Sequence, residues 1–328
     1  MGAIRPGFEE FQTLAQDATV VPVTRELLAD ALTPVLAWST IGGEPGSFLL
    51  ESVEHGEKWG RYSFVGFRPA IIARGRRGRF ETVRGGRVEA REVDDPWVPL
   101  RALLAEWKPP GEGLDWLPRF WGGAVGYVAY DSVRTFEPTV GERHHDPEAW
   151  DFAFAIGGTL LIFDDLRQRA YAVSLRRVDQ GDLRATYDAA LAELEDLTDE
   201  LSRPRIPRLL SPPTHRVEGE LPASSYDRPT VCAAVEQCKE HIRAGDIFQV
   251  VLSQRFAADA RGVDLFDVYR MLRAINPSPY MFLLRMPEVG IAGASPVSQI
   301  LPDHGSGAYG PSESTRQQLA ARGVDRAL

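Results

Sequence analysis

The order of hydrophobic and polar positions in the first 175 residues is mostly that of β-strands separated by glycine-containing turns. The segments predicted as strands are 35–41, 47–53, 62–67, a meander over 70–93, 121–130, 152–163 and 170–175. Two helices are predicted among them. One covers 24–32 with Thr24 as its N-cap, and the other covers 97–107 and is closed by Pro109 and Pro110.

Helical spacing dominates after residue 180. A single apolar stripe predicts a long helix against the core, formed by Leu183, Tyr187, Ala190, Leu194, Leu197 and Leu201. Prolines at four positions between 204 and 213 then indicate a stiff linker without regular structure. Beyond it the pattern predicts a helix over 225–244 that ends at Gly245, a strand over 247–256 and a helix over 264–275. In that last helix we expect Leu265, Val268, Leu272 and Ile275 to face inward.

Composition narrows the class of protein. The 328 residues are 44% hydrophobic and 25% charged, which is typical of a globular chain with a sizeable core. A net charge of −9 argues against nucleic acid as a partner. Two cysteines exclude a disulfide-built secreted domain, and no apolar run reaches the ~20 residues of a membrane span. The first 16 residues lack the apolar core of a secretory signal, so we expect a cytoplasmic protein without a membrane partner.

Three sequence segments carry a resemblance to a known family. The first is LLESVE at 49–54, followed by WGRYSF at 59–64. The second is AGDIFQVVLSQRF at 244–256, and the third is NPSPYMF at 276–282, followed by GASP at 293–296. In this order and spacing they resemble anthranilate synthase component I, the large subunit of the first committed enzyme of tryptophan biosynthesis.

The resemblance implies an α+β fold, with a large antiparallel β-sandwich flanked by helices. It implies that chorismate and Mg²⁺ are bound, and that ammonia adds to the ring and pyruvate leaves to give anthranilate. The ammonia would come from glutamine through a partner amidotransferase subunit. Tryptophan would inhibit at an allosteric site, for which the matching motifs supply Glu51, Ser52, Pro279, Tyr280 and Met281. A carboxylate suits the ligand's ammonium group, and rigid or polarizable side chains suit its indole ring.

Gln249 is a candidate active-site residue on the predicted strand 247–256. In related enzymes that add water to chorismate, the position matching Gln249 resembles a lysine, and a lysine side chain can act as a base. A glutamine side chain cannot take up a proton, which fits an enzyme whose nucleophile is ammonia. An ordinary polar strand residue would fit the sequence as well.

The sequence departs from the family pattern near its end. Val297 follows Ser295 and Pro296, where the family usually has glutamate, and residues 299–328 lose the pattern. No residue of this chain matches the family's active-site histidine and arginine or its two Mg²⁺-binding glutamates, so no catalytic or metal-binding residue is assigned. We therefore expect a sandwich that is incomplete at the C-terminus, and a chain that makes no anthranilate by itself.

The expected organisation is a tryptophan-binding domain over 1–203, a linker over 204–222, the beginning of a chorismate-binding domain over 223–297 and an atypical tail over 298–328. Two alternative functions stay open. One is a non-catalytic module that binds tryptophan. The other is the large subunit of aminodeoxychorismate synthase, which the LLES, WGRYSF and NPSPYMF segments fit less well.

Overall fold

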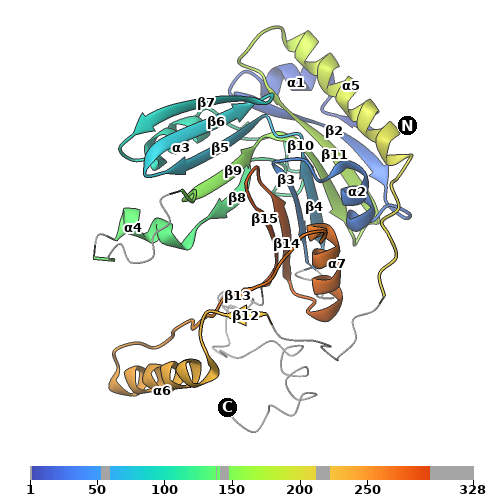
Figure 1. Ribbon diagram of the computed structural model, residues 1–328. Helices are drawn as coiled ribbons and strands as arrows, with labels where there is room; N and C mark the ends of the chain where they lie inside the picture. The colour runs from blue at the N-terminus through green and yellow to red at the C-terminus, as the bar shows by residue number, and fades with distance from the viewer. Residues whose placement is uncertain (1, 53–59, 138, 141–147, 212–221, 296–328) are drawn as a thin grey trace.

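The structure is a computed structural model that describes residues 2–52, 60–137, 139–140, 148–211 and 222–295. Its larger sheet has eight strands in the order β1-β2-β11-β10-β4-β3-β14-β15 (Figure 1). These strands are β1 (Ile4–Arg5), β2 (Val20–Leu28), β3 (Ser47–Glu51), β4 (Tyr62–Phe67), β10 (Gly158–Asp164), β11 (Arg169–Arg177), β14 (Tyr280–Arg285) and β15 (Gly290–Ser295).

A second sheet has five strands in the order β7-β6-β5-β9-β8. They are β5 (Ile71–Arg76), β6 (Gly78–Arg84), β7 (Arg87–Val93), β8 (Ala124–Val128) and β9 (Phe152–Ile156). A short hairpin pairs β12 (Ala223–Ser224) with β13 (Phe256–Ala257). Every strand pair within the described ranges is antiparallel, which confirms the expected α+β class with antiparallel sheets.

Helices cover one face of the eight-stranded sheet, and their buried side chains form the main core with it (Figure 1). They are α1 (Phe8–Leu14), α2 (Pro34–Ile41), α5 (Leu183–Leu201) and α7 (Leu265–Ile275). Five of the six residues predicted as the stripe of α5 are buried, so that prediction is confirmed. The opposite face of this sheet packs against residues 116–125, which include the start of β8. Helix α3 (Trp97–Ala105) packs on the five-stranded sheet. The 3₁₀ turn η1 (Tyr130–Ser132) and α4 (Val133–Phe136) follow β8.

Two neighbouring predictions near the N-terminus are wrong. A helix was predicted over 24–32, but residues 24–28 belong to strand β2. All nine residues of β2 pair in register with β11, and that pairing outweighs the local N-cap signal at Thr24. Residues 34–41 form helix α2 instead of a strand. Thr33 caps it by accepting a hydrogen bond from the backbone N–H of Leu36, and Pro34 occupies the first turn, where proline is favoured.

The predicted strand over 152–163 is in fact two strands in different sheets. Gly157 and Gly158 separate β9 from β10 with φ angles of +64° and +94°, which side chains other than glycine rarely adopt. A Cβ atom at Gly158 would lie 2.4 Å from the backbone oxygen of Arg68. These glycines therefore let the chain pass from the five-stranded to the eight-stranded sheet within two residues.

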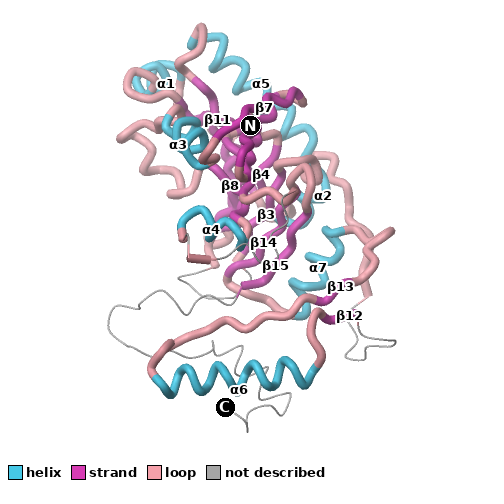
Figure 2. The backbone as a smooth tube through the Cα atoms, turned by 60° about the vertical axis from the view of Figure 1, so that its left-hand side comes forward, coloured by secondary structure: helices cyan, strands magenta, loops and turns pink. Residues whose placement is uncertain are grey.

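Helix α6 (Arg228–Ala244) and the β12–β13 hairpin project away from both sheets (Figure 2). Gly245 ends α6 in the left-handed conformation, as predicted. The strand predicted over 247–256 is wrong: only Phe256 pairs, with Ser224 in the short hairpin. Residues 247–255 have no regular structure, because no described strand lies beside them to supply backbone hydrogen bonds.

Candidate functional site

A cavity of about 1130 Å³ lies between the helix-free face of the eight-stranded sheet and strands β8 and β9. Its walls are mostly apolar and aromatic, and the aromatic residues lining it are Tyr62, Phe64, Phe120, Tyr127, Phe154, Tyr280 and Phe282. Burial raises the pKa of the Tyr62 and Tyr127 phenols, so both remain neutral hydrogen-bonding groups at ordinary pH. Cavities of this size and character are typical of sites for small organic ligands.

Strand register brings distant segments together at one end of this cavity. Glu51 of β3 pairs with Met281 of β14, so Ser52 lies beside Tyr280. On the other side of β3, Leu50 pairs with Phe64, and the same register continued along β4 brings Ser52 to Tyr62. Side chains alternate between the faces of a strand, so Ser52, Tyr62 and Tyr280 share the cavity face. The Oγ atom of Ser52 is buried and has no hydrogen-bond partner among the described residues.

Glu51 contributes to the cavity wall, but its carboxylate is held by helix α7. The side chain is only 2% exposed. The hydroxyl group of Tyr269 donates a hydrogen bond to Oε2 at 2.5 Å, and Arg273 approaches both oxygens at 3.3 and 3.4 Å. Burial, with the nearby negative charge of Glu51, raises the pKa of Tyr269 far above its usual range, so the phenol stays protonated. Among the described residues, Oε1 receives only the long contact from Arg273, so it can accept another donor on the helix-covered face.

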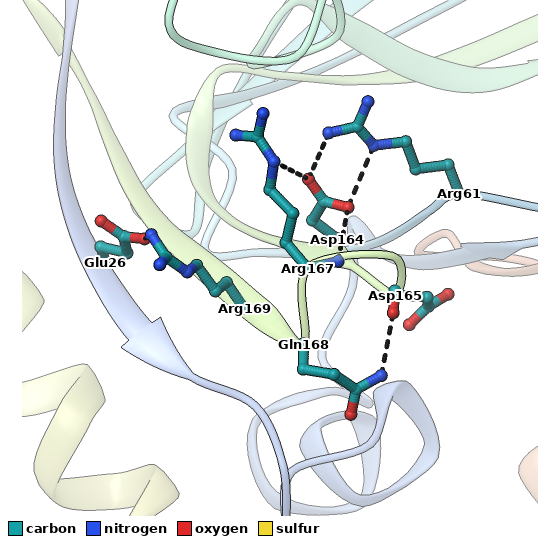
Figure 3. Close-up of polar contacts among 7 residues, drawn as sticks. All are labelled: Glu26, Arg61, Asp164, Asp165, Arg167, Gln168 and Arg169. Carbon is teal, nitrogen blue, oxygen red and sulfur yellow. Dashed lines mark hydrogen bonds and ion pairs between the residues drawn. The ribbon is translucent and has the colours of Figure 1, made fainter.

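Arg61 is the second charged residue of the cavity wall. Its Nε and Nη2 atoms donate to the two oxygens of Asp164 at 3.0 and 2.7 Å, and Asp164 is fully buried. Figure 3 shows the Asp164 carboxylate between the guanidinium groups of Arg61 and Arg167. The hydrogen bonds with Asp164 raise the pKa of Arg61, so this guanidinium is charged at any working pH. The sequence predicts no role for Asp164 beyond the turn, and it does accept a turn hydrogen bond from the backbone N–H of Arg167.

The structure brings the five residues expected to bind tryptophan into one place. Glu51, Ser52, Pro279, Tyr280 and Met281 all line the cavity. They differ in orientation, because Met281 packs in the core on the helix-covered face whereas Tyr280 is 40% exposed.

Gln249 does not join them. It is exposed in the irregular segment between α6 and β13, and it is not among the residues that line the cavity.

The residues that hold Arg61 and Glu51 in the cavity wall have weak signals in the sequence. Arg61 lies inside the WGRYSF segment, but its partner Asp164 is 103 positions away. Tyr269 and Arg273 are spaced by one helical turn, yet the predicted inward line of α7 takes a different phase. In the structure Val268 and Ile275 are 42% and 47% exposed, whereas Phe266 and Tyr269 are buried, so this part of the prediction is wrong.

The described residues do not fit a bound Mg²⁺ ion. No group of three or more His, Cys, Asp or Glu side chains among them could hold a metal ion, and no chemical step through a metal is derived. In the same part of the chain, no helix has the length and apolar character needed to cross a membrane.

The family is settled by comparison with known proteins. Residues 47–298 match the family model described as chorismate binding enzyme. The chain belongs to the chorismate-binding enzyme family. Two of its relatives are proteins named anthranilate synthase component 1. The protein from Acetivibrio thermocellus is 32% identical to this chain and the protein from Pseudomonas putida is 35% identical, each over 98% of this chain. A probable anthranilate synthase component 1 from Schizosaccharomyces pombe is 37% identical over 92% of it. The expected resemblance is therefore confirmed.

The chain spans 65% of the length of the Acetivibrio and Pseudomonas relatives and 58% of the Schizosaccharomyces relative. A solved structure of anthranilate synthase component I from Streptococcus pneumoniae is also similar, at 24% identity and a TM-score of 0.48, over 82% of this chain and 57% of that protein.

Proposed function

We propose that the cavity is a regulatory site for free L-tryptophan. The observation that carries the proposal is that Glu51, Ser52, Pro279, Tyr280 and Met281, from two segments far apart in the chain, line one cavity. The aromatic walls offer the flat apolar contact that an indole ring needs. Among the described residues the Oγ atom of Ser52 has no hydrogen-bond partner, so it gains a hydrogen bond from a polar ligand atom. Glu51 adjoins Ser52 in the chain, with its carboxylate held on the helix-covered face by α7.

We propose that the activity served by this site is anthranilate formation from chorismate and ammonia. Membership of the chorismate-binding enzyme family and the similarity to proteins named anthranilate synthase component 1 support it. Glutamine would supply the ammonia through a partner amidotransferase subunit, and Mg²⁺ would bind chorismate in the complete site. The 328 residues by themselves should make no anthranilate, because none of them matches the glutamates with which the family holds the metal.

The proposed organisation follows the sequence: a tryptophan-binding part over 1–203, a linker over 204–222, the beginning of the chorismate-binding part over 223–297 and a tail over 298–328, in a cytoplasmic protein. The eight- and five-stranded sheets would be the two layers of the expected sandwich. Contacts of Val125 of β8 with the apolar cluster around Phe48 and Leu284 support that arrangement.

Calorimetric titration with L-tryptophan tests the proposed ligand. We expect saturable binding to the whole chain, weaker binding of L-phenylalanine, and a loss of affinity in Ser52→Ala. Ser224→Ala changes an exposed hydroxyl that does not line the cavity and serves as the matched control. Equal binding by Ser52→Ala and the unchanged protein, or no binding of tryptophan at all, would contradict the proposal.

A second measurement separates an enzyme from a non-catalytic tryptophan-binding module. The purified chain is incubated with chorismate, Mg²⁺ and ammonia, and anthranilate is followed by fluorescence. We expect no product from this chain alone, together with stabilisation against heat by tryptophan. Product from the chain alone would overturn the expected inactivity.

A further inference from the structure

Arg61 is the basic residue of the cavity wall. Of the described residues that line the cavity, only Glu51 and Arg61 have an acidic or basic side chain. Glu51 pairs with Met281 and is held by Tyr269 of α7, so its carboxylate lies on the helix-covered face of the sheet. A guanidinium group in an otherwise apolar and aromatic cavity complements a ligand that bears a carboxylate group.

The guanidinium of Arg61 lies on the cavity side of the sheet, next to Tyr62. Its central carbon is 4.8 Å from the ring centroid of Tyr62, and Tyr62 faces the cavity. The strand register brings Tyr62 beside Ser52, and neighbouring strands lie about 4.8 Å apart. Arg61 and Ser52 therefore both adjoin Tyr62, and both line the cavity.

Partners among the described residues occupy one edge of this guanidinium. Nε and Nη2 form a two-point fork with Asp164, which is itself 1% exposed. Arginine has five N–H donors, so the edge formed by Nη1 and the second N–H of Nη2 is a further fork of the shape that a carboxylate accepts. No described residue accepts a hydrogen bond from that edge, and the Arg61 side chain is 33% exposed. Asp164 thus orients Arg61 and leaves its other edge for a ligand.

We infer that Arg61, together with Ser52, is the carboxylate-binding subsite of the cavity, and that Asp164 is the residue that positions it; the inference rests on the proposed binding of an aromatic amino acid. The subsite determines specificity. Aromatic molecules with a carboxylate gain affinity from the contact with Arg61, whereas amines and neutral molecules of the same shape do not.

Titrations of the whole chain with four indole compounds test the inference: L-tryptophan, indole-3-propionate without the ammonium group, tryptamine without the carboxylate, and indole. For the unchanged protein we expect tryptophan to bind about 10- to 100-fold more tightly than tryptamine, the usual value of a charge-assisted contact. In Arg61→Lys, which keeps a charge for Asp164 but loses the second fork, this advantage should fall to a few-fold while the affinity for tryptamine stays unchanged.

Two variants guard against an effect of misfolding. The double variant Arg61→Met with Asp164→Leu removes both charges of the buried pair, so no unpaired carboxylate is left to destabilise the fold. It should melt near the unchanged protein and bind tryptophan no better than tryptamine. Arg167→Gln also removes a neighbour of Asp164 but does not line the cavity, so it should keep the full preference.

The outcomes separate this inference from the proposed function. If indole-3-propionate binds and depends on Arg61 but tryptophan does not bind, the choice of tryptophan is wrong and the subsite stands. If Arg61→Lys loses affinity for tryptophan and tryptamine equally, or for neither, the subsite is wrong and tryptophan binding stands. If no compound with a carboxylate binds to the unchanged protein, both are wrong.

Discussion

The hydrogen bond from Tyr269 to Glu51 offers a sharp test of how α7 is held on the sheet. Tyr269 is fully buried, and its hydroxyl group donates to a carboxylate that is 2% exposed. The variant Tyr269→Phe removes the donor and keeps the ring. The carboxylate then retains only the long contacts with Arg273 at 3.3 and 3.4 Å.

The expected loss follows from the charge of the acceptor. Hydrogen bonds to charged groups contribute roughly 1.5–3 kcal/mol, so the free energy of unfolding should fall by about 2 kcal/mol near pH 8. Tyr187 gives the matched comparison, because its buried hydroxyl donates to the neutral backbone oxygen of Pro6 at 2.9 Å. Tyr187→Phe should lose only about 1 kcal/mol.

Alkaline pH should shrink the difference between Tyr269→Phe and the unchanged protein. The folded-state pKa of Tyr269 is raised, so its contribution is complete below the unfolded-state value of about 10 and is lost as the pH rises above it. Above that pH the unfolded chain releases the proton and the folded chain keeps it. The unchanged protein therefore loses about 1.4 kcal/mol at pH 11 relative to the variant, which has no phenol at this position.

Urea unfolding at pH 8 and pH 11, followed by circular dichroism, measures both effects. Tyr130→Phe is the neutral control, because Tyr130 is 93% exposed. A loss below about 0.5 kcal/mol for Tyr269→Phe would refute the reasoning, since even a neutral hydrogen bond usually contributes that much. A difference that stays constant between pH 8 and pH 11 would refute the proposed protonation of Tyr269.

Three further predictions concern the walls of the cavity and the projecting segment. Gly126→Ala should lower the free energy of unfolding by roughly 1–3 kcal/mol in urea denaturation, because the new Cβ would lie 1.9 Å from the backbone oxygen of Ala153. Gly7→Ala is the control, because a Cβ there has nothing within 4 Å, and it should leave the free energy of unfolding unchanged. Asp164→Ala should lower the free energy of unfolding by roughly 1–3 kcal/mol. This loss is smaller than that for breaking a fully buried ion pair, because Arg61 is partly exposed. An unchanged melting temperature would disprove the role of the two-point contact between Asp164 and Arg61. Gln249→Ala should change stability by less than about 0.5 kcal/mol, and a larger shift in thermal melting would mean that this exposed residue packs in solution.

Local patterns predicted the elements whose sequence and tertiary environment agree. Strand β4 was predicted over 62–67 and forms over the same residues, and the stripe of α5 is buried as its spacing indicated. The wrong predictions occur where pairing with a distant strand determines the secondary structure. Residues 20–28 contain a helical capping signal at Thr24 but form a strand, because β11 and β1 supply partners on both sides.

The candidate site was predicted only in part, for a related reason. The motifs supplied Glu51, Ser52 and the 279–281 segment, and the strand register brings these together. No local pattern could show that α7 holds the Glu51 carboxylate, since Tyr269 is 218 positions away from it in the sequence. The same holds for Asp164, whose turn position explained its residue type without any reference to Arg61.

The pairing of β3 with β14 has a consequence for synthesis on the ribosome. Until residues 280–285 have emerged, β3 lacks its neighbour on one side and remains an open edge, and the corner that holds Ser52 lacks Tyr280. Contacts between such distant segments form slowly, because a long stretch of chain must be ordered first. A nascent polypeptide released earlier would thus have most of its helices but no binding pocket, and capture of a small molecule would report that the last strands have been added.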